Sequence, residues 1–184
     1  DNNVQIKNAG RIKFNNIKTV KNRDENHVVV SRSGELSVID KFSREREKYK
    51  VPYGAILPVN DNVSVKSGAI VATWDPHTHP VIAEVAGNVN FMDFIDGVTM
   101  KHQADEMTGL SSIVITSDSQ KSGNKDVKPL VRLIGELGEE LCFPNTNMPA
   151  SYFMPIGAIL NIETGAKIEV GDVIARIPQE GSKN

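Results

Sequence analysis

The sequence has very little cysteine, few aromatic residues and no long apolar run. Its 184 residues include one cysteine, Cys142, so no disulfide can form within the chain, which indicates a reducing compartment such as the cytoplasm. Aromatic residues make up 5%, and no basic run is interleaved with them, which argues against a platform for stacked nucleic-acid bases. No apolar run approaches the length that spans a membrane. The formal net charge of -2 lacks the basic excess of a dedicated nucleic-acid binder.

What is present is a strong strand signal. Short runs rich in Val, Ile and aromatic residues alternate with Gly, Pro, Asn and Asp, and no stretch keeps helical apolar spacing over three turns. The sequence therefore predicts an all-β chain, with a hairpin turn at residues 31–34 in which Gly34 has a positive φ. The charged segment 41–50 is predicted to be a solvated strand in its second half. The polar segment 117–128 is predicted to be a loop or linker.

An internal repeat is the most informative feature. Residues 51–57, Val-Pro-Tyr-Gly-Ala-Ile-Leu, return as residues 154–160, Met-Pro-Ile-Gly-Ala-Ile-Leu, and the match continues without a gap for twenty-four residues. Gly68 pairs with Gly171 at a tight turn that favours glycine. Because the apolar positions keep their spacing, the same faces are expected to be buried in both copies, and we predict two related barrel-like units.

A weaker echo predicts how the units are connected. Residues 9–14, Ala-Gly-Arg-Ile-Lys-Phe, resemble residues 86–91, Ala-Gly-Asn-Val-Asn-Phe. The second copy follows the shared hairpin of the first unit, whereas the remaining copy lies at the N-terminus. We therefore expect the first unit, residues 21–116, to be inserted into the second, residues 117–184 closed by a strand from residues 1–20. The two termini should then lie close together.

Few residues are candidates for metal chemistry. In an extended segment His77 and His79 would point to the same face and could share a metal ion. A zinc site needs a third and usually a fourth ligand, and nothing in the sequence brings His102 or Cys142 to them. The prolines around these histidines favour a rigid connecting loop instead, and Cys142 is expected to be a small buried residue.

Lys101 is the candidate for a covalently bound cofactor. Biotinyl and lipoyl carrier domains modify a lysine beside a methionine at a hairpin tip, and Met100-Lys101 together with Gly-Asp-Val-Ile-Ala at residues 171–175 resembles parts of that motif. However, the carrier lysine should lie between the two half-motifs, whereas Met100-Lys101 comes after the second half. A carrier domain modified on Lys101 remains the alternative interpretation.

Other polar clusters are predicted to be structural. The acidic residues Asp93, Asp96, Asp105 and Glu106 are expected to form turns and solvated surface. The adjacent serines at 111–112 lack a nucleophile elbow, and the sequence contains no P-loop or Gly-x-Gly-x-x-Gly motif. We therefore expect no catalytic, cofactor-binding or metal-binding residue in the chain.

Four long motifs carry a resemblance to a known family. They are Lys-Val-Pro-Tyr-Gly-Ala at 50–55, Ala-Thr-Trp-Asp-Pro-His-Thr-His-Pro at 72–80, Asp-Glu-Met-Thr-Gly-Leu-Ser-Ser at 105–112 and Ala-Arg-Ile-Pro-Gln-Glu at 175–180. Over essentially the whole chain the sequence resembles the β′ subunit of bacterial DNA-directed RNA polymerase, at the lineage-specific insertion that interrupts the trigger loop in proteobacterial enzymes. The resemblance implies two sandwich-barrel hybrid motifs, in agreement with the repeat.

The resemblance implies a role in transcription beside the chemistry of this nucleotidyltransferase. The Asn-Ala-Asp-Phe-Asp-Gly-Asp motif that holds the catalytic magnesium in the family is absent from this sequence, and so are the zinc-binding cysteines. The expected function is therefore modulation of trigger-loop motion, nucleotide addition, pausing and transcript cleavage.

The same resemblance implies the partners. We expect the rest of β′, the α, β, ω and sigma subunits and secondary-channel transcription factors, with DNA contacted only through the whole enzyme and no membrane. The cytoplasm, at the bacterial nucleoid, is the expected location. The polar ends of the chain fit a segment of a longer polypeptide, which argues against a free-standing binding module. The isolated segment is expected to be a monomer, because its role requires one copy per polymerase.

Overall fold

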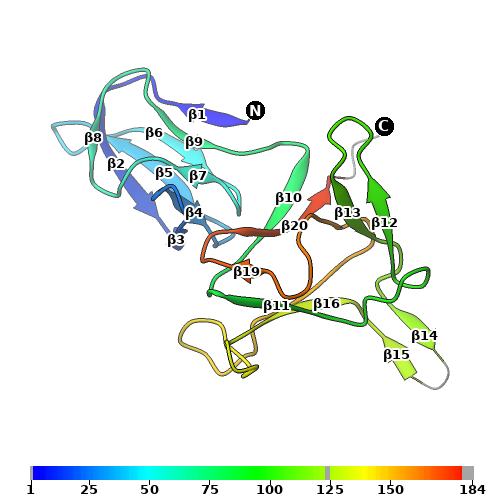
Figure 1. Ribbon diagram of the computed structural model, residues 1–184. Helices are drawn as coiled ribbons and strands as arrows, with labels where there is room; N and C mark the ends of the chain where they lie inside the picture. The colour runs from blue at the N-terminus through cyan, green and yellow to red at the C-terminus, as the bar shows by residue number, and fades with distance from the viewer. Residues whose placement is uncertain (1, 123–124, 180–184) are drawn as a thin grey trace. The chain divides into compact units, whose positions relative to one another are not determined.

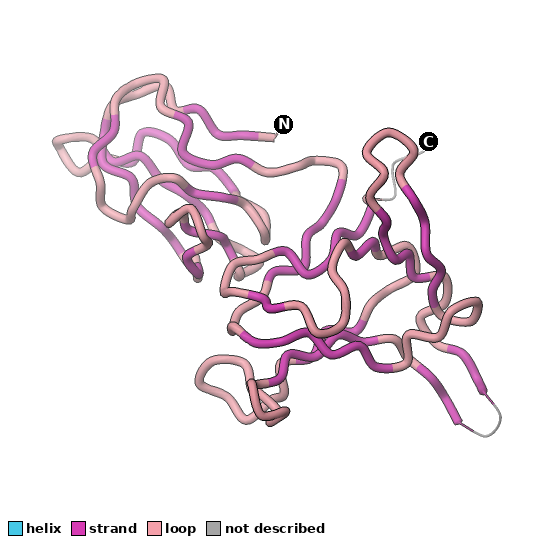
Figure 2. Tube along the Cα trace, in the orientation of Figure 1, coloured by secondary structure: helices cyan, strands magenta, loops and turns pink. Residues whose placement is uncertain are grey.

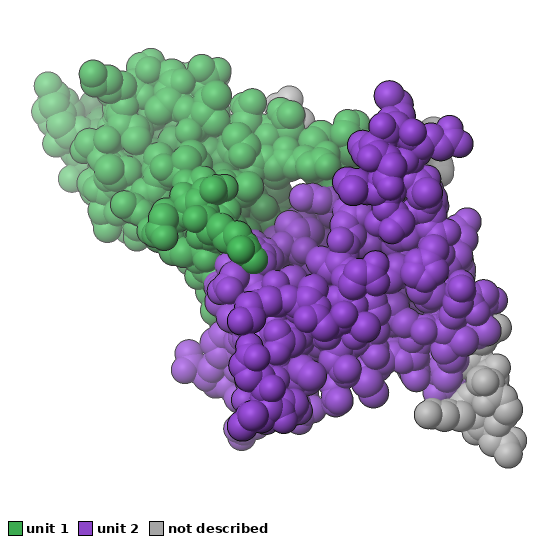
Figure 3. Space-filling view, in the orientation of Figure 1, with its two compact units in different colours: residues 1–79 green, residues 80–184 purple. Residues whose placement is uncertain are grey.

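The computed structural model describes residues 2–122 and 125–179, which form strands, turns and loops and no helix (Figure 1, Figure 2). The predicted all-β class is therefore confirmed. The chain divides into two compact units, Asp1–His79 and Pro80–Asn184, which Figure 3 shows in different colours. Within the described part of the chain, no helix could cross a membrane.

The first unit consists of two antiparallel sheets. The strand order is β1-β9-β7-β4-β3 in one sheet and β6-β5-β2-β8 in the other. The strands are β1 (Asn3–Gln5), β2 (Gly10–Asn15), β3 (Thr19–Lys21), β4 (His27–Val29), β5 (Glu35–Ile39), β6 (Glu45–Lys50), β7 (Ile56–Leu57), β8 (Ser64–Val65) and β9 (Ile70–Thr73).

The second unit also has one five-stranded and one four-stranded sheet. Their orders are β10-β20-β18-β13-β12 and β17-β16-β11-β19, and β14 and β15 form a separate hairpin. The strands are β10 (Thr78–Ile82), β11 (Gly87–Met92), β12 (Met100–Ala104), β13 (Ser111–Ile115), β14 (Gln120–Ser122), β15 (Lys125–Val127), β16 (Leu130–Ile134), β17 (Ser151–Phe153), β18 (Ile159–Leu160), β19 (Lys167–Ile168) and β20 (Val173–Pro178).

The two units repeat one strand arrangement. Strands β1 to β9 correspond in order and in pairing to β10, β11, β12, β13, β16, β17, β18, β19 and β20. In both copies the first strand of the unit lies beside the last one, β1 beside β9 and β10 beside β20. Each unit therefore begins and ends on neighbouring strands. The two predicted related units are present.

The predicted insertion of the first unit into the second is wrong. Strand β2, which contains residues 11–14, pairs with β5 and β8 of its own unit, and β11 makes the equivalent pairs with β16 and β19. The echo between residues 9–14 and 86–91 is a true repeat, but it precedes the shared hairpin in both units. The predicted boundaries 21–116 and 117–184, with residues 1–20 closing the second unit, fail for the same reason. The chain is a linear tandem of two complete units.

The shared hairpin has the same backbone geometry in both copies. Gly54 and Gly157 have φ values of 89° and 93°, and their N–H groups each donate to a carbonyl of a neighbouring strand at 2.8 Å. Gly68 and Gly171 have φ values of 90° and 87°. An L-residue with a Cβ rarely adopts this conformation. The tight turn predicted at Gly68 and Gly171 is confirmed, and its backbone is left-handed.

Each unit encloses its own hydrophobic core. Leu57 and its repeat partner Leu160 are fully buried, as are Ile12 and its partner Val89. Burying one such side chain contributes about 1.5–3 kcal/mol relative to leaving it in water. The apolar positions that the repeat preserves are thus the positions that fill the two cores.

The hairpin predicted at residues 31–34 is wrong. Strands β4 and β5 on either side of this segment belong to different sheets, so the segment is a crossing between sheets. Gly34 does not have a positive φ. A Cβ at Gly34 would lie 2.6 Å from Cγ1 of Ile17, so glycine is needed there for close packing.

The two remaining local predictions have different outcomes. Strand β6 alternates between exposed and half-buried residues, which confirms the solvated strand in the second half of segment 41–50. Segment 117–128 is not a linker between units. It lies inside the second unit and contains β14 paired with β15.

Candidate interaction surface

The predicted metal candidates do not form a site with other ligands. His77 and His79 are both exposed. The N–H of His77 donates to Oδ1 of Asp75 at 2.8 Å, so these residues form an aspartate-anchored turn that leads into β10. Among the described residues, no group of three or more His, Cys, Asp or Glu side chains is arranged to hold a metal ion. Neither His102 nor Cys142 joins the pair in such a group.

Cys142 was expected to be buried, and this prediction is wrong. Its side chain is exposed, in the long connection between β16 and β17. The flanking residues Leu141 and Phe143 pack against the core, and Cys142 between them faces solvent. Alternation along an extended segment accounts for this arrangement, because successive side chains point to opposite sides.

Lys101 is not at a hairpin tip. It lies within β12, where it is paired with Val114 of β13, and Met100 beside it is buried. The tip of this hairpin is formed by residues 105–110. A carrier lysine must project from a tip toward a modifying enzyme, so the position of Lys101 does not favour the carrier alternative.

The acidic residues form turns, as predicted. The Asp93 carboxylate accepts a backbone N–H from Lys128 at 3.0 Å. Oδ1 of Asp105 accepts the N–H groups two and three residues later, at 2.8 and 3.2 Å. Asp96 and Glu106 are exposed. These carboxylates anchor turns or face solvent.

The clearest electrostatic perturbation lies in the first unit, between Glu47 and Tyr49. The Tyr49 hydroxyl donates to the Glu47 carboxylate, and this hydrogen bond, together with burial, raises the pKa of Tyr49 to about 12. Burial alone would raise the pKa of Glu47. Hydrogen bonds from Tyr49 and from the N–H groups of Lys7 and Asn8 outweigh that effect, and the pKa of Glu47 is lowered overall. This cluster fastens β6 to the connection between β1 and β2.

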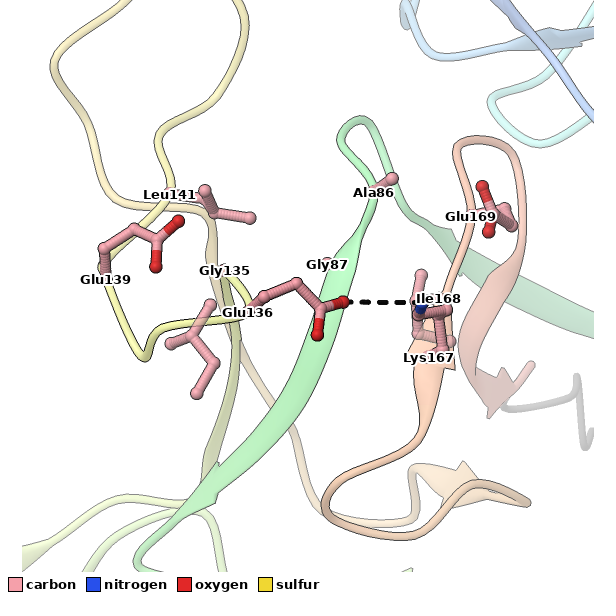
Figure 4. A pocket seen from close by; sticks show the side chains of 10 residues that line it. Ala86, Gly87, Gly135, Glu136, Glu139, Leu141, Lys167, Ile168 and Glu169 are labelled. Atoms are coloured by element: carbon pink, nitrogen blue, oxygen red, sulfur yellow. Dashed lines mark ion pairs between the residues drawn. The ribbon is translucent and has the colours of Figure 1, made fainter.

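A groove of about 330 Å³ lies at the edge of the four-stranded sheet of the second unit (Figure 4). Its walls include Gly87 and Ile168, and its rim carries Glu136, Glu139 and Lys167. The Glu136 carboxylate and Nζ of Lys167 form an ion pair at 3.4 Å, which Figure 4 marks. Three carboxylates, those of Glu136, Glu139 and Glu169, line the groove with one lysine, so its charge suits contact with a basic side chain.

Highly exposed apolar side chains are concentrated in the second unit. Of the seven large apolar residues in the described chain that are at least 60% exposed, six lie there. Met107 at the β12–β13 tip is 93% exposed and Leu110 is 69% exposed. The others are Leu137, Met148, Phe153 and Ile156. Met107 and Leu110 lie on one tip, so this tip is the candidate for contact with another protein segment.

Met107 and Leu110 were not predicted from the sequence to be surface residues. A signal was present, because both lie among the turn-forming residues Asp105, Thr108 and Gly109. At the tip of this hairpin both residues lie beyond the paired strands, where they are exposed. The surface of the second unit, with its groove and the β12–β13 tip, is therefore the candidate interaction surface.

No family model matches the chain. Curated proteins do match it. The chain is 55% identical over 182 residues to the DNA-directed RNA polymerase subunit beta' of Methylococcus capsulatus, which covers 98% of this chain. It is 54% identical over all 184 residues to the protein of the same name from Shewanella oneidensis, and 53% identical to that from Shewanella amazonensis. The chain spans only 13% of the length of these relatives.

Proposed function

Because the chain is homologous over its full length to one segment of the β′ subunit of DNA-directed RNA polymerase, we propose that it is a non-catalytic module inserted in the trigger loop of such a subunit. In this role it modulates trigger-loop motion, nucleotide addition, pausing and transcript cleavage. The observation that carries the proposal is the identity of 54% over all 184 residues to a segment that makes up 13% of the relative. In this proposal the nucleotidyl-transfer chemistry with its magnesium, and the separate zinc site of the family, belong to other parts of the enzyme.

The strand arrangement supports an insertion. In each unit the first and last strands are neighbours, and the carbonyl of Asn2 at the start of the first unit accepts the N–H of Trp74 near its end at 3.0 Å. A unit of this kind takes the chain away from a loop and returns it to nearly the same place. It can therefore be added to a loop without forcing the two ends of the loop apart.

The mechanism is a coupling of free energies. A folded module joined to a mobile loop must move whenever the loop changes state, so any contact that the module prefers in one state biases the loop toward that state. A difference of about 1.4 kcal/mol changes the ratio of the two states tenfold. This effect needs no catalytic residue in the module, because the module changes the populations of the two loop states and does not make or break a covalent bond.

The partners in this function are the remainder of β′ and the α, β, ω and sigma subunits, with secondary-channel transcription factors as further candidates. DNA is contacted through the assembled enzyme. The single copy of β′ in a polymerase means that one module acts in each enzyme. The cytoplasm is the corresponding compartment.

The test is removal of residues 1–184 from β′, with the flanking segments rejoined and the polymerase reassembled. The shortened enzyme is expected to extend RNA and to show pause lifetimes and cleavage rates that differ by about twofold or more from those of the intact enzyme. Variants that differ in the length of the rejoining linker control for strain in the loop itself. Unchanged pausing, addition and cleavage in all of these variants would overturn the proposal.

A further inference from the structure

The repeat supplies an internal reference for the β12–β13 hairpin. Its counterpart in the first unit is the β3–β4 hairpin, whose connection is residues 22–26. Both turns are built around a side-chain oxygen that accepts backbone N–H groups. Oδ1 of Asn22 accepts the N–H groups two and four residues later, both at 3.0 Å. Oδ1 of Asp105 accepts those two and three residues later, at 2.8 and 3.2 Å.

The two tips differ in what they present to solvent. After Asn22, the tip of the first unit has the charged residues Arg-Asp-Glu at 23–25. After Asp105, the tip of the second unit includes the apolar residues Met107 and Leu110. The first unit shows that this hairpin forms with charged residues at its tip. The apolar side chains of the second tip are therefore not required by the fold, and keeping Met107 93% exposed and Leu110 69% exposed is unfavourable in water.

The tip is also held in one conformation. The N–H of Asp105 donates to the Leu110 carbonyl at 2.8 Å, and the N–H of Gly109 donates to the Asp105 carbonyl at 2.8 Å. The two strands below the tip are paired over five residues each. Figure 1 shows the hairpin projecting from the rest of the second unit. A projecting group that is ordered in advance loses little conformational entropy when it binds.

We propose that the tip, residues 105–110, is a docking finger that inserts Met107 and Leu110 into an apolar socket with a basic rim, located on a part of the polymerase outside this chain. This inference rests on the proposed function. It adds the residues through which the module makes its contact. Met107 suits such a role because its flexible, polarizable side chain adapts to a socket of irregular shape.

Two observations indicate which protein segment provides the socket. First, the chain spans 13% of the length of its relatives, so most of the subunit that could cover the finger lies outside it. Second, the charges are complementary to a basic rim. The second unit contains 14 acidic and 8 basic residues, and Glu106 is exposed beside Met107 at the tip itself. A carboxylate at the edge of an apolar contact selects a positively charged neighbour.

The experiment uses a photo-crosslinking amino acid in place of Glu106 in the assembled polymerase. We expect a crosslink to a segment outside residues 1–184 that contains apolar residues flanked by Lys or Arg. The double variant Met107→Asp with Leu110→Asp should reduce the crosslink yield about tenfold or more, because central apolar anchors dominate such contacts. The conservative pair Met107→Leu with Leu110→Met should retain it. Phe42→Asp, at a large apolar residue of the first unit that is 65% exposed, is the matched control and should also retain it.

The outcomes separate this inference from the proposed function. The finger is wrong if no crosslink leaves the module, or if the double aspartate variant crosslinks as well as the unchanged tip. If that happens while deletion of residues 1–184 still alters pausing, the proposed function stands without the finger. If the crosslink forms and is lost in the double variant while the deletion leaves all kinetics unchanged, the contact is real and the modulatory function fails.

Discussion

The two units share one strand order and differ in their surfaces. The first contains 13 basic and 9 acidic residues, whereas the second contains 8 basic and 14 acidic residues, so the nearly neutral chain consists of one basic and one acidic half. Six of the seven large apolar side chains that are at least 60% exposed in the described residues also lie in the second unit. Because the repeat preserves the core residues and changes the surface residues, the core residues are those that the fold needs. The surface residues are free to differ and to make contacts with other proteins.

The connections show the same division. The β5–β6 connection covers residues 40–44, and its counterpart between β16 and β17 covers residues 135–150. The β4–β5 connection covers residues 30–34, and its counterpart contains the whole β14–β15 hairpin. Additions are tolerated in such loops because closing a longer loop costs little extra entropy. The second unit is therefore the elaborated copy, and the first is closer to the minimal fold.

The largest expected effect tests whether the two cores are independent. Leu57→Ala and Leu160→Ala remove equivalent, fully buried side chains from different cores. Each substitution should destabilise its own unit by about 2–5 kcal/mol and leave the other unit within about 0.5 kcal/mol. Hydrogen exchange followed by mass spectrometry reports each unit separately. Equal loss of protection in both units after either substitution would mean that they unfold as one.

A matched control lies beside one of these leucines. Ile56 is the neighbour of Leu57 in β7 and is 37% exposed. Ile56→Ala removes an apolar side chain from the same strand without opening a cavity in the core, so its effect should be well below that of Leu57→Ala.

The sequence predicted the repeated unit well and its connection badly. The match between residues 51–74 and 154–177 predicts the shared hairpin, its glycine turns and its buried faces, because local spacing determines each of these. It does not determine which distant strand lies beside residues 10–15. That choice depends on long-range packing, and either unit could have accepted the strand by pattern alone. The structure places it in the first unit.

The candidate surface was harder to predict for a related reason. Whether Cys142 or Leu137 faces solvent depends on how the 135–150 connection lies on its sheet, and apolar content alone does not contain that information. Gly34 is a similar case. Its need for glycine comes from Ile17, which lies in another part of the sequence. Positive φ at Gly68 was predictable because a turn between two short strands is a local feature.

One turn has a positive φ in both units but is occupied by different residues. Asn62 and Gly165 are repeat partners with φ values of 69° and 89°, and their N–H groups each donate to the carbonyl of Ile12 or of Val89 at 2.7 Å. Asn is the non-glycine residue that adopts this conformation most readily. Gly165→Asn should therefore change the stability of the second unit by about 0.5 kcal/mol or less. Gly165→Val should cost about 1–2 kcal/mol more.

Thermal unfolding of the two Gly165 variants measures this difference. A Cβ at Gly165 would meet no atom within 4 Å, so a loss of stability cannot be attributed to a clash at Cβ. Equal stability of the Asn and Val variants would show that backbone conformation does not explain the choice of residue at this turn.

The smallest expected effect on stability concerns one backbone N–H group that donates its hydrogen bond to a different kind of acceptor in each unit. In the first unit the N–H of Lys7 donates to the Glu47 carboxylate at 3.0 Å. In the second unit the equivalent N–H, that of Glu84, donates to the hydroxyl of Tyr152 at 3.3 Å. Tyr152 is itself the repeat partner of Tyr49. A carboxylate therefore holds this connection in the first unit, and a tyrosine hydroxyl holds it in the second.

This difference should make the first unit more sensitive to acid. The pKa of Glu47 in the folded state is below its ordinary value of 4.5, so the carboxylate contributes stability that is fully present above about pH 4.5 and is lost as the pH falls through the folded pKa.

Glu47→Gln keeps the shape of the side chain and removes the titration. Hydrogen exchange between pH 6 and pH 3, corrected for intrinsic rates, should show the first unit losing protection relative to the second in the unchanged chain. The Gln variant should show a smaller relative loss. Tyr49→Phe, which removes one donor to Glu47 and leaves the two backbone donors, should fall between them. A relative loss of protection that is the same in all three chains would mean that other carboxylates cause the acid sensitivity, and the comparison of the two connections would not account for it.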